Sequence, residues 1–84
     1  MPTKLELCID IADSLWKCGP LTAEQLTSRL EVNSLLLEQQ LEFLVGQEMV
    51  KKEETGLSVT YIIAGRGIMV LEFFKVLPST RIAV

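Results

Sequence analysis

The segment from Leu21 to Leu26 constrains the fold more than any other part of this 84-residue chain. Thr22 and Gln25 have the spacing of a capping box, in which each side chain accepts a hydrogen bond from the other residue's backbone N–H. Leu21 and Leu26 stand at the positions of a hydrophobic staple, which fixes the angle at which the chain enters a helix. A helix is therefore expected to begin here, and the apolar positions that follow predict that it ends after about two turns, near Leu30.

A longer helix is expected after a three-residue turn. Asn33, the last residue of that turn, is the expected N-cap of a helix over residues 34–47. The apolar residues of its buried face recur every three or four positions, at Leu37, Leu41, Leu44 and Val45. A short helix, a three-residue turn and a longer helix together have the spacing of a helix-turn-helix.

Another helix is expected at the start of the chain, from Leu5 to about Cys18, with Thr3 as its N-cap. The side chains of its expected core face follow a helical period, at Leu5, Cys8, Ile9, Ala12, Leu15 and Trp16. Leu7 and Ile11 widen the apolar arc to more than half of the circumference. An arc of this width predicts that other elements cover the helix on two sides.

The period of the apolar residues changes after Met49. Residues 50–54 and 58–63 have the composition of two short strands, and the glycine-containing turn 55–57 joins them. This pattern is typical of a β-hairpin.

A last helix is expected over residues 68–77, because Pro78 is expected to end it. The predicted fold is therefore α+β and mostly α, in the order α-α-α-β-β-α. It forms one domain over residues 1–78, and residues 79–84 are expected to be a flexible tail.

This order of elements resembles the winged helix-turn-helix family, and most closely its small archaeal DNA-binding members. Three motifs carry the resemblance, which covers nearly the whole chain: Leu21-Thr22-x-x-x-Leu26-x-x-x-Leu30, Leu41-x-x-Leu44-x-x-x-x-Met49-Val50 and Tyr61-x-Ile63-x-x-x-Gly67. They match the family's second helix, the end of its recognition helix, and the exit from the wing into the last helix. The resemblance implies a DNA-binding transcription regulator, although Ala64 stands where the family usually has a capping Thr.

In the family, the exposed side of the third helix enters the major groove and the wing contacts phosphates. The resemblance therefore implies DNA contacts for seven residues, Asn33, Ser34, Leu35, Gln39, Lys51, Lys52 and Arg66. Lys51 and Lys52 have a second explanation, since lysines on edge strands keep hairpins soluble. An exposed Leu35 has three possible explanations: contact with thymine methyl groups, packing on a partner protein, or the ordinary exposure of a single leucine.

Charge argues against tight DNA binding. The chain has 8 Lys and Arg against 11 Asp and Glu, a net charge of −3. Residues 30–50 contain four Glu and no Lys or Arg, and Glu38 and Glu42 lie on the face that would meet phosphates. A second hypothesis is therefore a winged helix that has lost DNA binding and serves as a protein-interaction or dimerisation module.

The first and last helices carry more apolar residues than one small core can bury. The surplus comprises Leu7, Ile11, Met69, Val70, Phe73 and Val76. In water these side chains would form a contiguous patch that soluble monomers rarely expose. We therefore expect a twofold homodimer in which the two helices pair with their copies. The alternative is a monomer whose own tail covers the patch.

The sequence contains no catalytic or metal-binding constellation. It has no His, and Cys8 and Cys18 would lie about 15 Å apart on one helix, too far for a disulfide. Both are expected to be reduced thiols. The segment Gly65-Arg66-Gly67 is expected to be a turn at the exit of the wing rather than an anion-binding loop. We therefore expect a protein that is not an enzyme and needs no cofactor or metal.

The start of the chain does not have the pattern of a signal peptide, because Lys4, Glu6 and Asp10 interrupt any early apolar run. No stretch approaches the ~18 uncharged apolar residues of a membrane helix. We expect a cytoplasmic protein with no membrane partner.

Overall fold

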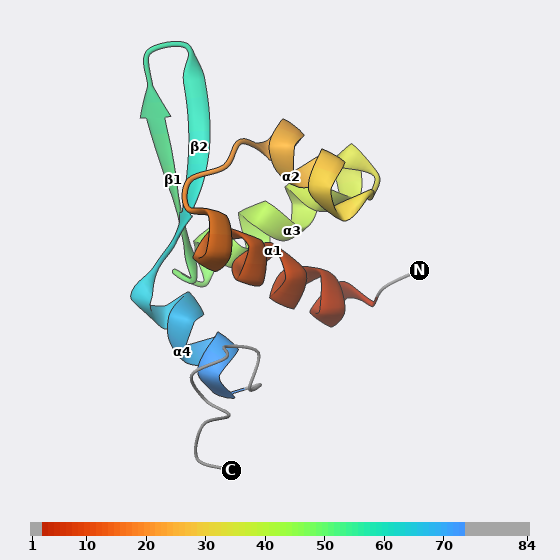
Figure 1. Cartoon of the computed structure of the whole chain (residues 1–84), viewed down its shortest axis with the longest axis vertical. Coiled ribbons are helices and arrows are strands. Elements are labelled where there is room, and N and C mark those ends of the chain that lie inside the picture. Colours follow the sequence, from red (N-terminus) through yellow and green to blue (C-terminus); the bar gives the residue numbers. More distant parts are fainter. Residues whose placement is uncertain (1–2, 74–84) are drawn as a thin grey trace.

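The computed structural model describes residues 3–73, which form four helices and one β-hairpin (Figure 1). The elements follow the predicted order: α1 (Lys4–Cys18), α2 (Ala23–Leu30), α3 (Ser34–Gly46), β1 (Val50–Thr55), β2 (Ser58–Ile63) and α4 (Gly65–Phe73). The first three helices and both strands begin and end within one residue of their expected bounds.

The three predicted N-caps are confirmed. Thr22 Oγ1 accepts a hydrogen bond from Gln25 N at 3.1 Å, and Gln25 Oε1 accepts one from Thr22 N at 2.9 Å. Thr3 forms the same capping box with Glu6 at the start of α1. Asn33 Oδ1 accepts from two backbone N–H groups in the first turn of α3. Local hydrogen bonds therefore determine where each of these helices begins.

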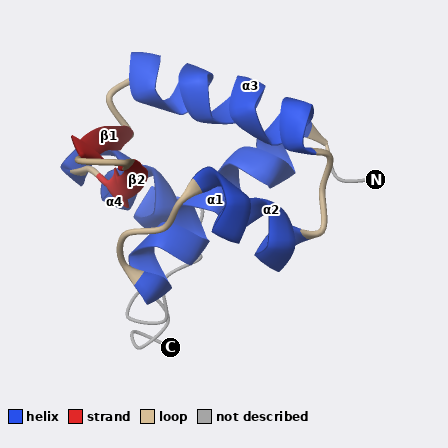
Figure 2. Ribbon diagram, turned by 90° about the horizontal axis from the view of Figure 1, so that it is seen from above, coloured by secondary structure: helices blue, strands red, loops and turns tan. Residues whose placement is uncertain are grey.

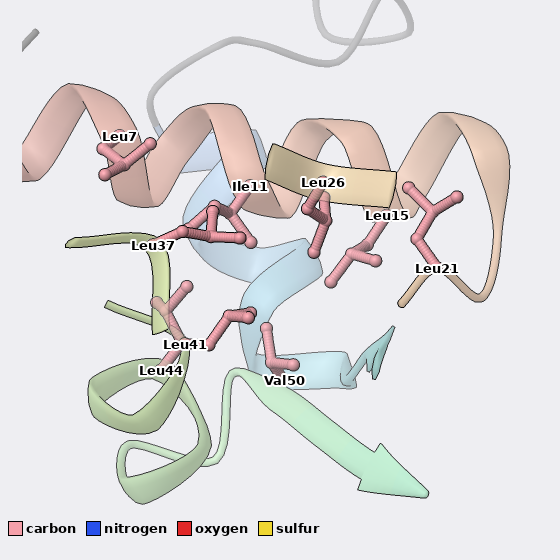
Figure 3. Close-up of a cluster of buried hydrophobic side chains, with 9 residues drawn as sticks. All are labelled: Leu7, Ile11, Leu15, Leu21, Leu26, Leu37, Leu41, Leu44 and Val50. Carbon is pink, nitrogen blue, oxygen red and sulfur yellow. The ribbon is translucent and has the colours of Figure 1, made fainter. Parts of the chain in front are cut away.

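A cluster of buried apolar side chains joins the first three helices to the base of the hairpin (Figure 3). It contains Leu7, Ile11, Leu15, Leu21, Leu26, Leu37, Leu41, Leu44 and Val50. Burying each of these side chains stabilises the fold by roughly 1.5–3 kcal/mol, so the cluster is the main favourable term in folding.

The expected orientation of α1 is wrong in part: Ala12 and Leu15 are buried as predicted, but other positions are not. Leu7 and Ile11, predicted for the outer side of this helix, are 1% and 0% exposed and lie in the core. Leu5 and Trp16, predicted for the core face, are exposed. The apolar arc of α1 is so wide that its period does not determine which part faces α2 and α3. The packing of these helices makes that choice.

The hairpin projects from the helices and is attached to them at its base (Figure 1). Its antiparallel register pairs Val50 with Ile63 at the base and Thr55 with Ser58 at the turn. Leu21, between α1 and α2, pairs with β2: its N–H donates to Tyr61 O at 3.1 Å, and Tyr61 N–H donates to Leu21 O at 2.8 Å. This third, one-residue strand was not predicted, and it holds the hairpin against the connection between α1 and α2.

Helix α4 begins three residues before its expected start. The segment 65–67, expected to be a turn, forms its first turn, because Ile68 N–H donates to Ala64 O at 3.1 Å. Ala64 N–H donates in turn to Met49 O at 3.0 Å, which joins the start of α4 to the end of α3. The expected end of this helix at residues 77 and 78, the limit of the domain and the tail over 79–84 lie outside the described residues.

Replacing Gly67 by alanine should lower the free energy of unfolding by about 1–3 kcal/mol. Gly67 is buried, and a Cβ there would clash with Met49 O and lie 2.7 Å from Ile63 Cδ1. A Cβ at Gly65, two residues earlier in the same turn, would meet nothing within 4 Å. Urea unfolding of both variants measures these free energies. Gly65→Ala is the control and should leave stability unchanged or slightly higher, so a loss confined to Gly67→Ala would confirm the close packing of α4. Equal effects of the two substitutions would contradict it.

Candidate nucleic-acid interface

The exposed side of α3 is the part of the fold that sequence analysis assigned to DNA. Helix α3 lies at the edge of the helical part, with α1 and α2 on one side of it (Figure 2). Leu37, Leu41 and Leu44 are buried, whereas Leu35 is 64% exposed and Gln39 is also exposed. The predicted division of α3 into a core face and a free face is therefore confirmed.

Asn33 and Ser34 lie at the N-terminal end of this free face. Asn33 Oδ1 accepts from Leu35 N at 2.8 Å and from Leu36 N at 3.1 Å, so the oxygen of this amide is committed to capping α3. Ser34 borders a shallow cleft of about 320 Å³ between α2 and α3. Because Glu24 and Glu38 also line this cleft, its charge disfavours a phosphate.

The two lysines of the hairpin lie near its base. Lys51 stands opposite Ile62 and Lys52 opposite Tyr61, and both are exposed. Successive residues of a strand point to opposite faces, so the two ammonium groups do not form one patch. Neither lysine has an ion-pair partner within residues 3–73. Both charges are therefore available to an anion.

Arg66 lies at the opposite end of α3 from Asn33. Its Nη1 donates to Gln47 O at 3.4 Å and lies 3.7 Å from Glu48 Oε1. Both side chains of this ion pair are largely exposed, so the pair contributes little to stability. The seven predicted residues thus occupy three places: the N-terminal half of α3, the base of the hairpin, and the region beyond the C-terminal end of α3.

Arg29 is a cation that sequence analysis did not assign to the interface. It lies exposed in the last turn of α2, five residues before Ser34. It has no ion-pair partner in the described part of the chain. Its place four residues before the N-cap of α3 is visible in the sequence.

The acidic residues of α3 lie where they were expected. Glu38 and Glu42 are exposed on the same side as Gln39, and neither forms an ion pair among residues 3–73. A duplex approaching this side would meet uncompensated negative charge. Between residues 3 and 73, no group of three or more His, Cys, Asp or Glu side chains is placed to hold a metal ion. None of the helices in that range is long and apolar enough to cross a membrane.

Comparison with known proteins identifies the fold. No protein-family model and no curated protein matches the chain. Several solved structures do match. Among them, reduced HlyU from Vibrio cholerae N16961 has a TM-score of 0.68 and 24% identity, over 83% of this chain and 77% of that one. The AntR antimony-specific transcriptional repressor has a TM-score of 0.64 and 16% identity, over 82% of this chain and 60% of that one. With these neighbours, the helices and the hairpin define a winged helix-turn-helix fold, as the sequence predicted.

Proposed function

We propose that this chain is a DNA-binding regulator of transcription, with α3 in the major groove and the β1–β2 hairpin on the phosphate backbone. One observation carries the proposal: the N-terminal half of α3 has an exposed side, in a fold that also contains two hairpin lysines with no ion-pair partner among residues 3–73. The likeness to a transcriptional repressor supports it at the level of the fold. In this proposal the protein acts by binding rather than by catalysis, and it acts in the cytoplasm. The resemblance to archaeal members of the family in particular stays a prediction.

Each contact in this proposal has a chemical reason. Gln39 presents an amide that can pair with adenine, and Leu35 presents methyl groups to thymine. Lys51 and Lys52 neutralise phosphates, which displaces counterions from the duplex. With only two such contacts, the logarithm of the affinity should fall with the logarithm of salt concentration with a slope of about −2. Binding would then be weak at physiological salt.

The acidic side of α3 favours a second candidate function. Glu38 and Glu42 repel phosphates but attract a basic protein surface. In this alternative, the same exposed side of α3 binds a protein partner and the hairpin lysines serve only to keep the edge strands soluble.

We also propose that the protein is a homodimer, with an interface that differs from the one first expected. Leu7 and Ile11 are core residues, Val76 lies outside the described range and Val70 is half-buried, so Met69 and Phe73 remain. Met69 and Phe73 are 67% and 80% exposed, one turn apart on α4. A twofold axis beside α4 would bury this stripe against its own copy.

Reversing the charge of both hairpin lysines tests the DNA proposal. Lys51→Glu with Lys52→Glu should abolish binding of duplex DNA at low salt, whereas Glu38→Lys should strengthen binding several-fold. The control is Lys4→Glu with Lys17→Glu, which changes the net charge equally on α1. Mobility-shift titrations of the four proteins check these outcomes.

Two results would decide against this model. If the hairpin variant binds as well as the parent, the lysines do not contact phosphates. If neither the parent nor Glu38→Lys retards DNA at low salt, the protein-interaction alternative replaces DNA binding.

The dimer proposal predicts that Met69→Glu yields a monomer, because the substitution buries a carboxylate at the interface. Leu57→Glu is the matched control, since Leu57 is fully exposed at the hairpin turn and an acid there should leave the mass unchanged. Sedimentation of both variants measures the mass, and the melting temperature of the parent should rise with protein concentration. A parent protein that sediments as a monomer at high micromolar concentration would contradict the dimer.

A further inference from the structure

A groove of about 470 Å³ runs between α1, α3 and α4. It lies on the side of α1 that turns away from the leucine core, and Leu5, Ile9 and Val70 form part of its walls. Its volume falls within the range of small-molecule sites. No residue of the proposed DNA interface lines it, so the groove is separate from that function.

The groove contains a buried amide with an unused donor. Gln40 is 8% exposed, and its Oε1 accepts a hydrogen bond from Cys8 Sγ at 3.2 Å. Its Nε2 donates to no group within residues 3–73. Gln40 Nε2 is not fully enclosed, because Asp13 Oδ1 is the one side-chain polar atom of the described residues that is both fully enclosed and unpaired, and Gln40 lines the groove. A buried amide of this kind is better satisfied by a hydrogen-bond acceptor in the groove.

The groove also has a cationic end. Lys4 lines it from the first turn of α1 and has no ion-pair partner among the described residues. No Asp or Glu of the described range lines the groove, so its charge favours an anion. Lys4 and Ala12 line its two ends along α1, about 12 Å apart by the rise of the helix. Cys8 and Gln40 lie between these ends, and Leu71 packs against Ala12.

We infer that this groove binds a medium-chain carboxylic acid. The apolar chain lies towards Ala12 and Leu71, and the carboxylate accepts a hydrogen bond from Gln40 Nε2 and pairs with the Lys4 ammonium group. An alkyl chain that starts at Gln40 is expected to fill the apolar part of the groove around Ala12 and Leu71, and decanoate is a suitable probe. The assignment does not depend on DNA binding, because none of the residues that line the groove belongs to the proposed DNA interface.

Labelling of the two cysteines with iodoacetamide tests occupancy in the full chain. Cys8 lines the groove, and Cys18, on the same helix, is exposed and outside it. Burial raises the pKa of the Cys8 thiol, so its labelling is compared with and without decanoate at one fixed pH. Saturating decanoate should slow the labelling of Cys8 by about tenfold or more and leave Cys18 unchanged.

Three outcomes would overturn the inference. Decanoate could leave the labelling rate of Cys8 unchanged. Labelling of Cys8 could slow as protein concentration rises without decanoate, which would show that a second copy fills the groove. Cys8 could resist labelling at every protein concentration while Cys18 reacts, which would show that the chain itself fills the groove.

Substitution of the polar groups tests the position of the carboxylate. Gln40→Leu keeps the volume of the side chain and should weaken decanoate binding about tenfold or more in calorimetric titration. Gln39→Leu, the exposed neighbour, is the matched control and should bind as the parent does. Lys4→Gln changes an exposed side chain, so it folds even if Gln40→Leu does not, and it should also weaken binding. Unchanged affinity in Lys4→Gln and in a folded Gln40→Leu would overturn the assignment.

Discussion

The rotational setting of α1 is the constraint on which the rest of this structure depends. Three of its side chains, Leu7, Ile11 and Leu15, are at most 1% exposed and pack in the same cluster as residues of α2 and α3. Each contributes roughly 1.5–3 kcal/mol, a large share of the stability of so small a domain. This choice turns Leu5 away from the cluster, towards the groove beside α4, and places Cys8 where it packs against the edge of the cluster and also lines the groove. The rotation of α1 about its own axis therefore determines both the core and the groove.

What the sequence predicted well was local. The caps at Thr22 and Asn33 act within one helical turn, so their residues and spacing are sufficient to place α2 and α3. The order of the elements followed from these caps and from the change of period after Met49. Features that depend on distant contacts were missed: the Leu21–Tyr61 pairing joins residues 40 positions apart, and the setting of α1 is decided by its neighbours.

In the candidate interface, too, local features were predictable from the sequence and features that depend on distant contacts were not. The free side of α3, with its acidic residues, was predictable because Leu37, Leu41 and Leu44 recur at helical spacing. The burial of Gln40 and the exposure of Phe43 did not follow from that spacing. The resemblance implied DNA contacts for Lys51, Lys52 and Arg66, but strand alternation separates Lys51 from Lys52, and Arg66 lies beside the end of α3. A winged helix with this charge distribution lacks the electrostatic term that supplies most of non-specific DNA binding, so the proposed specificity must come mainly from base contacts and shape.

The most direct test of the central claim is an NMR titration of the labelled protein with duplex DNA at low salt. The account predicts amide shift changes at residues 34–39 of α3 and at Lys51 and Lys52, with α1 and residues 68–73 of α4 unaffected. Changes confined to α1 and α4, or no changes at any DNA concentration, would contradict the assignment of α3 and the hairpin to nucleic acid.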